Sequence, residues 1–312
     1  MRMGIPGAKG EDTAGGKHSS VGAEPVSGLS RGRERLLRRI SVRKGREAEG
    51  VVVLEGPRVI ATAMECGARI SFVLSSEDVP ASEGVKAPHV EARLAADEVS
   101  GQVPALLRRL AESDVEVLRL PAERVASFSG TDSPRGLLAV AEQPDSPLPD
   151  PVRGAVERWL VLDGVQDPGN VGALIRTASA LGIDRVLVLD GTADPWGAKA
   201  VRSSAGTVFS LPVHSLGWPE LEERLPHGAP PLLVADAGGQ DVRAWLNSRG
   251  DVGASAAPWA LVLGNEGRGP RPEALARAVR TVAVPIGPAA DSLNVSSAGA
   301  ILLWALGPGQ GT

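Results

Sequence analysis

Three short polar segments in the second half of the chain carry the side chains with which chemistry could be done. They are residues 167–172, 263–267 and 291–299, and the first two directly end β-like apolar stretches. No histidine lies in any of them, which counts against histidine-based acid–base chemistry and against a metal centre. The functional side chains that these segments and the residues just after them supply are Asn170, Arg176, Asn265, Glu266, Ser292, Asn294 and Ser296.

Each of these side chains also has an ordinary structural explanation. Asn170 and Ser292 stand where helices are expected to begin, and a short polar side chain there caps the first turn. Glu266 could cap the helix that follows its loop, and Arg176 could form a surface ion pair. Spacing alone leaves these alternatives open.

The apolar runs of the second half predict a parallel sheet. They are continuous rather than alternating, as in strands that are buried on both faces. The expected strands are residues 159–162, 186–189, 208–213, 232–235, 261–263 and 281–284. Expected helices include residues 170–181 and a last helix that begins near Ser292. Such sheets bind ligands beyond the carboxyl ends of their strands, so the three polar segments should converge on one site. No Gly-x-Gly-x-x-Gly opens a strand–helix unit, so an ordinary dinucleotide site is not supported.

The first half predicts a smaller α/β module. Between residues 36 and 141, short apolar strands alternate with helical patterns, as in a layered α/β domain. Residues 143–151 contain four prolines, which indicates a semi-rigid linker. We therefore divide the chain into a disordered tail (1–28), an α/β domain (29–142), a linker (143–157) and a second α/β domain (158–308).

Several classes of protein are excluded by composition. The single cysteine, Cys66, rules out an intrachain disulfide framework and a cysteine-based zinc site. No apolar segment reaches the roughly 18–20 residues of a membrane span, and the start of the sequence lacks the apolar region of a secretory signal. These observations predict a cytoplasmic protein that does not enter a membrane.

Basic residues are concentrated near the start of the chain, although the net charge is −4. Residues 31–46 hold eight arginines and lysines against one glutamate, a local charge of +7. So one-sided a run favours contact with a polyanion over a solvated helix face. Aromatic residues make up only 3% of the chain, which argues against an aromatic platform for base stacking.

The polar segments resemble the motifs of a known family. Residues 163–178 (DGVQDPGNVGALIRTA) closely resemble the first motif of the SpoU branch of the SPOUT RNA methyltransferases. Residues 263–267 (LGNEG) resemble the second motif, and residues 285–296 resemble the third through PIG and SLNVS. Residues 199–206 are also similar to a family stretch. The first domain resembles the family's substrate-binding module through its basic start and through residues 54–56 and 136–140, so the resemblance covers most of residues 30–306.

The resemblance implies a fold and an activity. It implies an α/β fold in which a parallel-sheet domain with a deep trefoil knot follows a smaller N-terminal α/β RNA-binding domain. It implies methylation of a ribose 2′-hydroxyl in RNA, S-adenosylmethionine as the cofactor, no metal ion, and a homodimer formed through the second domain. Large-subunit ribosomal RNA is the favoured substrate. The alternatives are a tRNA methyltransferase of the same family and a catalytically inactive RNA-binding homologue, whereas the local charge of +7 disfavours a small-molecule methyltransferase.

The resemblance also assigns roles to individual positions. The residues that match the family's catalytic or substrate-positioning residues are Asn170, Arg176, Glu266, Ser292 and Asn294. The residues that would hold the cofactor are Gly264, Asn265, Gly267, Val284, Ile286, Leu293 and Ser296. The basic residues that would contact RNA are Arg31, Arg35, Arg38, Arg39, Arg43, Lys44, Arg46, Lys199 and Arg202. An arginine stays protonated, so we expect Arg176 to fix a phosphate and stabilise a developing alkoxide rather than act as a base.

Overall fold

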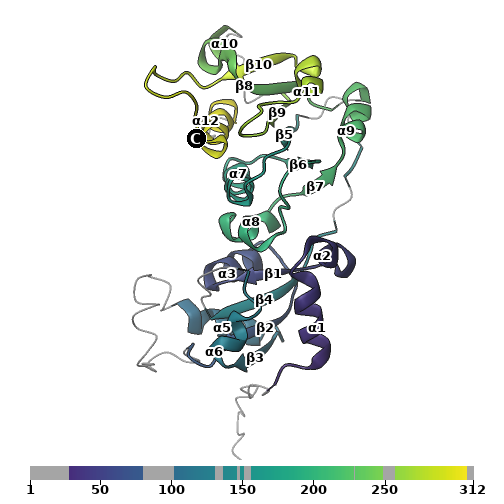
Figure 1. Cartoon of the computed structure of the whole chain (residues 1–312), viewed down its shortest axis with the longest axis vertical. Coiled ribbons are helices and arrows are strands. Elements are labelled where there is room, and N and C mark those ends of the chain that lie inside the picture. Colours follow the sequence, from purple (N-terminus) through teal and green to yellow (C-terminus); the bar gives the residue numbers. More distant parts are fainter. Residues whose placement is uncertain are drawn as a thin grey trace, which may run out of the picture.

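The computed structural model describes residues 28–79, 102–130, 136–145, 148–150, 156–227, 229–248 and 257–307. In these residues the chain forms two α/β units, each built on its own sheet, with the first unit below the second in Figure 1. The predicted tail lies outside the described residues except for Gly28. No helix in the described part of the chain is long and apolar enough to cross a membrane.

A four-stranded sheet with the order β1-β4-β2-β3 forms the first unit. The strands are β1 (Val51–Glu55), β2 (Ile70–Ser76), β3 (Glu116–Leu120) and β4 (Leu137–Glu142). Strand β4 runs antiparallel to both of its neighbours, while β2 and β3 are parallel. The helices are α1 (Arg31–Ile40), α2 (Arg43–Glu49), α3 (Pro57–Glu65), α5 (Gln102–Glu112) and α6 (Ala122–Ala126). Buried residues of α3 and α5 pack on one face of this sheet, and those of α1 and α6 pack on the other.

A six-stranded sheet with the order β10-β8-β9-β5-β6-β7 forms the second unit. The strands are β5 (Arg158–Leu162), β6 (Arg185–Leu189), β7 (Val213–Leu216), β8 (Leu232–Asp241), β9 (Trp259–Leu263) and β10 (Arg280–Ala283). Every neighbouring pair is parallel, as the continuous apolar runs predicted. Their carboxyl ends therefore lie at one edge of the sheet, where the polar segments follow.

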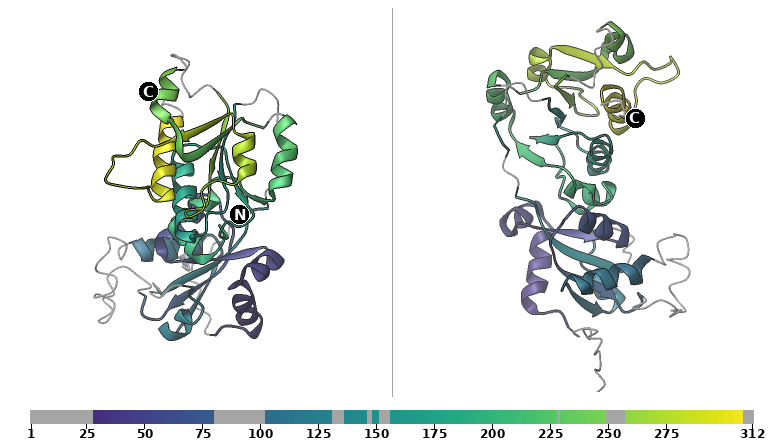
Figure 2. Two further views of the ribbon diagram at one scale, coloured as in Figure 1. Left: turned by 45° about the horizontal axis from the view of Figure 1, so that its top comes forward. Right: turned by 180° about the vertical axis from the view of Figure 1, so that it is seen from behind.

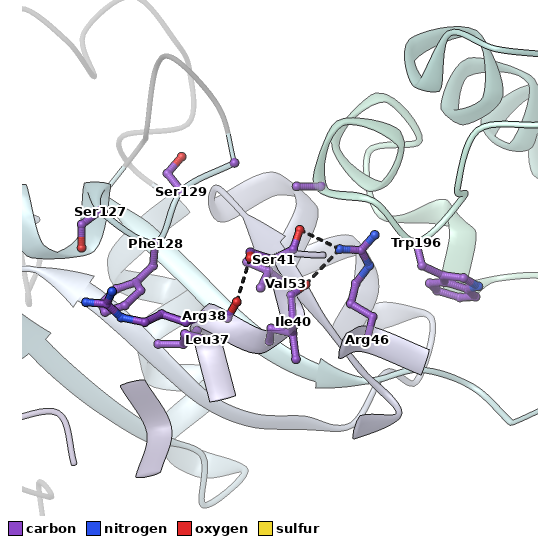
Figure 3. Close-up of a pocket in the computed structure, with 12 residues that line it drawn as sticks. Leu37, Arg38, Ile40, Ser41, Arg46, Val53, Ser127, Phe128, Ser129 and Trp196 are labelled. Carbon is purple, nitrogen blue, oxygen red and sulfur yellow. Dashed lines mark hydrogen bonds between the residues drawn. The ribbon is translucent and has the colours of Figure 1, made fainter. Parts of the chain in front are cut away.

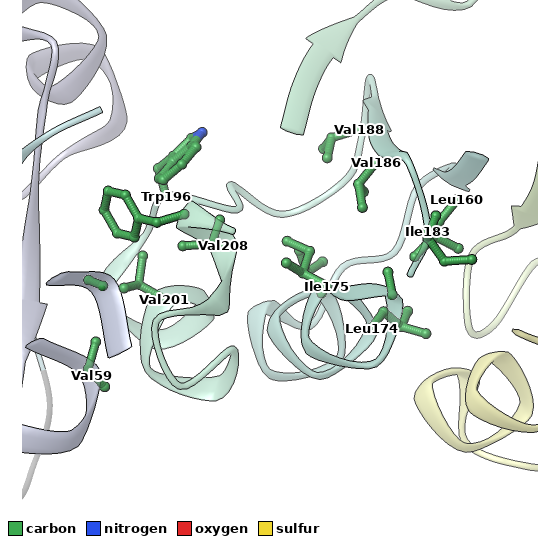
Figure 4. Packing of buried hydrophobic residues seen from close by; sticks show 14 of the residues in the cluster. Val59, Leu160, Leu174, Ile175, Ile183, Val186, Val188, Trp196, Val201 and Val208 are labelled. Atoms are coloured by element: carbon green, nitrogen blue, oxygen red, sulfur yellow. The ribbon is translucent and has the colours of Figure 1, made fainter. Parts of the chain in front are cut away.

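Helices cover both faces of the second sheet (Figures 1 and 2). One face carries α7 (Pro168–Ala180), α8 (Ala198–Ser203), α10 (Val242–Ser248) and α12 (Val295–Leu306). The other carries α9 (Trp218–Arg224) and α11 (Pro272–Arg277). Figure 4 shows the first of these two cores, where Leu174 and Ile175 of α7 lie over Leu160 and Val186 of the sheet.

Two expected elements are placed differently in the structure. The strand expected at residues 208–213 is wrong: a short 3-10 helix (Thr207–Phe209) follows Gly206, and β7 begins only at Val213. Gly206 has a φ of 88°, a left-handed conformation that interrupts extended chain. The last helix begins at Val295 rather than near Ser292. The expected knot concerns how these segments thread, and it stays a prediction.

The two units meet closely rather than through a loose connection. The carbonyl oxygen of Val59 in α3 would lie 2.6 Å from a Cβ on Gly206, so only glycine fits at this contact. Val59 also belongs to the same apolar cluster as Val201 and Trp196 of the second unit, as Figure 4 shows. Packing at this contact is thus one of the interactions that set the orientation of one unit on the other.

Candidate active site

The three polar segments converge through a network of side chains. The Glu266 carboxylate accepts hydrogen bonds from the backbone amides of Gln166 (3.1 Å) and Asp167 (3.3 Å), and from Nδ2 of Asn170 (3.1 Å). Oδ1 of Asn170 in turn accepts from Nδ2 of Asn294 (3.2 Å). Residues about 100 positions apart in sequence are therefore joined at the carboxyl edge of the sheet, as the parallel topology predicts.

Helix caps fix the positions of the two asparagines, although not in the way the sequence suggested. Helix α7 is capped by Asp167, whose Oδ1 accepts from the amide of Gly169 (2.5 Å), so Asn170 lies inside the first turn. Helix α12 is capped by Asn294, whose Oδ1 accepts from the amide of Ser296 (2.8 Å). The capping interpretations of Asn170 and Ser292 are thus wrong. Asn294 uses its oxygen for the cap and its Nδ2 group for the network.

Electrostatics keep the Glu266 carboxyl ionised. Burial alone would raise its pKa, but hydrogen bonds from the amide of Gln166 and from Asn170 outweigh burial and lower it below the usual 4.5. A carboxylate that accepts several hydrogen bonds is a weak base. Glu266 is therefore suited to holding the loops together rather than to removing a proton.

A second set of contacts fixes the first loop to the second. Nδ2 of Asn265 donates to the carbonyl of Gly164 (2.8 Å), and its Oδ1 accepts from the amides of Gly267 and Arg268. The buried carboxylate of Asp163 forms an ion pair with Arg271 (2.5 Å). Burial raises the pKa of Asp163, and the guanidinium of Arg271 opposes that rise.

A cavity of about 480 Å³ opens beside this network. Its wall comes from the middle of β8, from the carboxyl ends of β9 and β10 with the loops that follow them, and from α12. Leu293 and Ile286 line it with side chains that remain 37% and 40% exposed, so a bound molecule would remove apolar surface from water there. The predicted site residues that line the cavity are Gly264, Asn265, Glu266, Val284, Ile286, Ser292, Leu293 and Asn294.

Other predicted site residues stand outside the cavity wall. Gly267 and Ser296 do not line it, and the Ser296 hydroxyl donates to Oδ1 of Asn294 (2.6 Å). Asn170 does not line the cavity either, but its side chain is hydrogen-bonded to Glu266 and Asn294, which do. Arg176 is exposed on α7, and no ion pair or hydrogen bond holds its side chain within the described part of the chain. The surface ion pair considered for Arg176 is therefore not formed in one chain.

The sequence reasoning missed Asp236 in β8. It lines the cavity, and its Oδ1 accepts from the amide of Gly238 (2.7 Å). The signal was present, because the apolar run at residues 232–235 ends in Asp236 and then in Gly238 and Gly239, as the other two runs end in polar loops. The family motifs simply do not include this position.

Most of the basic run near the start of the chain is neutralised by carboxylates. Arg33 pairs with Glu116, Arg38 with Glu34, Arg39 with Glu49 and Arg43 with Glu47. Arg46 is buried and pairs with Asp194 of the second unit, so its expected contact with RNA is corrected to a structural one. The local +7 overestimates the available charge, because Glu47 and Glu49 follow the counted run and Glu116 and Asp194 come from distant segments.

A few of these cations remain available. Arg31, Arg35 and Lys44 are exposed and form no ion pair within the residues that the structure describes. Farther along the chain, Nζ of Lys199 lies 3.0 Å from Oδ1 of Asp167, which places this exposed lysine beside the first loop. Lys199 and the Gly169 amide together lower the pKa of Asp167. Arg202 is half-buried on α8.

Two family models match this chain, one over each unit. The model of the SpoU rRNA Methylase family matches residues 157–304, and that of the MRM3-like substrate binding domain matches residues 35–139. The 23S rRNA (guanosine(2553)-2′-O)-methyltransferase RlmP of Bacillus subtilis is 31% identical over 238 residues, which cover 76% of this chain and 88% of that protein.

Two solved structures have the same overall fold. The AdoMet-bound rRNA methyltransferase from Sinorhizobium meliloti superposes with a TM-score of 0.69 at 23% identity, covering 91% of this chain and 97% of that one. The SpoU methyltransferase AviRb from Streptomyces viridochromogenes, in complex with AdoMet, gives 0.68 at 25% identity, covering 89% and 97%. Both likenesses extend over the two units together.

Replacing Glu266 with Gln should destabilise the protein in a pH-dependent way. Because folding lowers the pKa of Glu266, its ionised carboxyl stabilises the fold at pH values above the usual pKa of 4.5. This contribution is lost as the pH falls through the folded-state pKa. Because the side chain is exposed, we expect a loss of only about 0.5–1.5 kcal/mol at pH 7. Urea unfolding from pH 7 downward should show the gap to wild type closing in acid. Glu223→Gln, an exposed glutamate on α9, should show no such gap, and a gap that stays constant with pH would contradict the assignment.

Proposed function

The chain belongs to the SpoU rRNA methylase family, and on that premise we propose that its active site lies where the three polar segments meet. The protein transfers the methyl group of S-adenosylmethionine to a ribose 2′-hydroxyl of ribosomal RNA. The site assignment rests on the hydrogen-bonded bridge from Glu266 through Asn170 to Asn294, whose two ends line the cavity. The tRNA alternative is not favoured.

The cavity has the chemistry that this cofactor needs. Its apolar wall, which includes Leu263 and Leu302, suits a purine ring, and the polar groups of Asp236 and Asn265 suit the amino and hydroxyl groups. When bound, S-adenosylmethionine supplies an electrophilic methyl group on a sulfonium. We assign the half-exposed side chains of Leu293 and Ile286 to the apolar surface that contacts the bound cofactor.

The side chains around the cavity can align the ribose and stabilise charge. Ser292 and Asn294 lie on the last loop, where they can donate hydrogen bonds to the incoming nucleotide. Because Glu266 is held ionised and fully engaged, it orients Asn170 rather than taking the proton of the 2′-hydroxyl. As that proton leaves to solvent or to a phosphate oxygen, a guanidinium beside the developing alkoxide lowers its energy. Arg176 is our candidate for this cation.

The position of Arg176 suggests that two copies of the chain build each site. Arg176 is exposed and does not line the cavity of its own chain. Its helix, α7, packs beside α12, which presents Ile301 and Trp304 to solvent at 42% and 76% exposure. Apolar side chains one turn apart on an otherwise packed helix are typical of a protein interface. We propose a homodimer through this surface, in which Arg176 serves the partner's cavity.

Arg176→Ala should abolish methyl transfer without weakening cofactor binding. Loss of a cation that acts only on the developing charge costs roughly 10²–10³-fold in rate. The variant should therefore transfer less than about 1% of the wild-type methyl groups to RNA from tritiated S-adenosylmethionine, while calorimetry gives an unchanged cofactor Kd. Arg280→Ala, an exposed arginine at the opposite edge of the sheet, is the matched control and should retain transfer. Substantial transfer by Arg176→Ala would refute the role.

Removal of the exposed apolar stripe on α12 should yield monomers. In Ile301→Asp/Trp304→Asp, two charges replace the apolar surface proposed to be buried between protomers. Sedimentation should show the wild type as a dimer and the variant as a monomer that has also lost methyl transfer. Leu275→Asp changes a 40%-exposed leucine on α11, on the other face of the sheet, and should remain dimeric. A monomeric wild type that is fully active would exclude the shared site.

The unpaired basic residues of the first unit should carry more of the RNA affinity than the paired ones. Each phosphate contact contributes about 0.7–0.9 to the slope of log K against log salt. Arg31→Gln/Arg35→Gln/Lys44→Gln should therefore flatten the slope by about 2–3. Arg39→Gln/Arg43→Gln removes two cations that already have carboxylate partners and should flatten it less. Equal slopes for wild type and the triple variant, measured by fluorescence anisotropy, would reject this surface.

A further inference from the structure

Arg46 occupies the junction between the substrate-binding unit and the methyltransferase unit. It belongs to α2, but its side chain is only 9% exposed. Nη1 donates to the carbonyls of Ile40 (2.9 Å) and Ser41 (3.1 Å), which end α1, and Nη2 forms an ion pair with Asp194 of the second unit. Figure 3 shows the guanidinium between Ser41 and Trp196, at the edge of a junction cavity of about 290 Å³. One side chain thus fixes the α1–α2 corner to the other unit.

Asp194 belongs to a segment that supports the first loop of the active site. The amide of Ala193 donates to the carbonyl of Val165 (2.8 Å), and the hydroxyl of Thr192 accepts from the amide of Gly164 (2.8 Å). The next two amides of that loop, those of Gln166 and Asp167, donate to Glu266. The loop is therefore held between the segment that carries Asp194 and the carboxylate that organises the site.

Other contacts of the same segment make the junction well defined. Oδ1 of Asp194 accepts from the amide of Trp196 (3.0 Å), so the ion-paired carboxylate also fixes its own backbone. Trp196 packs edge-to-face on Phe209 with ring centroids 5.4 Å apart. Farther along, Lys199 reaches back to Asp167. A shift of Asp194 would therefore disturb both the packed junction and the first loop.

Because the Arg46–Asp194 ion pair is buried, removing one of its partners should cost more than removing a partner from the exposed pairs of α1 and α2. A buried arginine whose partner is removed leaves an uncompensated charge, which is strongly unfavourable, whereas loss of an exposed pair changes little. The guanidinium has its Nη donors turned to Ile40, Ser41 and Asp194, and with 9% of the side chain exposed it offers little surface to a phosphate. Arg46 therefore serves to hold the two units in position, not to bind RNA with its charge.

Building on the proposed function, we propose that Arg46 is a positioning residue for methyl transfer. Its ion pair with Asp194 fixes the RNA-binding face of α1 and α2 relative to the segment that supports the first catalytic loop. RNA held on the first unit then presents its ribose to the cavity in one orientation. Alignment of two substrates is a large part of the rate in a transfer between them, so a small misorientation lowers kcat.

A mutant cycle on the full-length protein tests this role. The set is wild type, Arg46→Met, Asp194→Asn and the double variant, with Arg46→Lys as the conservative rescue. We expect each single variant to lower kcat for RNA methylation by about tenfold or more, because misplacement of a bound substrate reduces the reactive fraction. The double variant should be no worse than Arg46→Met, and Arg46→Lys should recover part of the loss. The Kd for S-adenosylmethionine and the salt slope of RNA binding should stay at wild-type values.

The outcomes separate positioning from RNA contact and from a loss of fold. A flatter salt slope with unchanged kcat would mean that Arg46 contacts phosphate, and additive effects in the cycle would mean that the ion pair is not the link; either result overturns the proposal. Arg109→Met, which removes an exposed ion pair with Glu65 within the first unit, should change neither quantity. If Arg46→Met does not fold by circular dichroism, Asp194→Asn and Arg46→Lys still decide, because both keep a polar partner in place.

Small-angle scattering tests the geometry without any assay of activity. Arg46→Met and Asp194→Asn should broaden the interdomain distance distribution relative to wild type, and Arg109→Met should not. A scattering profile unchanged from wild type in both junction variants would overturn the positioning role. Absence of methyl transfer in the wild type would count against the proposed function alone and leave the scattering result to stand on its own.

Discussion

One carboxylate joins the three polar segments of the proposed active site into a network. Six parallel strands deliver their polar loops to the same edge, but a sheet does not specify how those loops are fixed to one another. Backbone amides at that edge need acceptors, and Glu266 accepts from two amides of the first loop and from Asn170. Asn170 passes the restraint to Asn294, which caps the last helix. The carboxylate thus links the first loop to the last through Asn170, while Asn265 and the Asp163–Arg271 ion pair fix the first loop to the second.

The same interactions limit what Glu266 can do in catalysis. A carboxylate that satisfies three donors has a lowered pKa and little affinity for another proton. In the described residues the cavity wall carries one more carboxyl, Asp236, and it accepts a hydrogen bond from the amide of Gly238. On the proposed assignment, such a site would accelerate transfer by alignment and by stabilising charge, because both carboxyls already accept hydrogen bonds from the protein.

Sequence reasoning succeeded where a rule of topology governed the outcome. Continuous apolar runs predicted the parallel sheet, and the parallel sheet predicted that the segments around Asn170, Glu266 and Asn294 would meet. It failed where the outcome depended on which of several polar neighbours takes a hydrogen bond. Asp167 and Asn294 cap the helices, although Asn170 and Ser292 were equally plausible from residue type. Asp236 went unnoticed because no motif marks it. The ion pairs of Arg33 and Arg46 could not be foreseen, since their partners lie 83 and 148 residues away.

The reassignment of Arg46 changes how the basic start of the chain should be understood. The sequence alone does not show which basic side chains are exposed or paired, so the eight cations of residues 31–46 look like one RNA-binding surface. Within the described residues, folding divides them into exposed cations that form no ion pair, exposed ion pairs, and one buried pair that joins the two units. Only the first group offers its full charge to a phosphate, while the last can act only through geometry. The proposed reaction, in which RNA is bound on one unit and methylated at the other, requires both. Affinity without a fixed junction would deliver the ribose to no particular place.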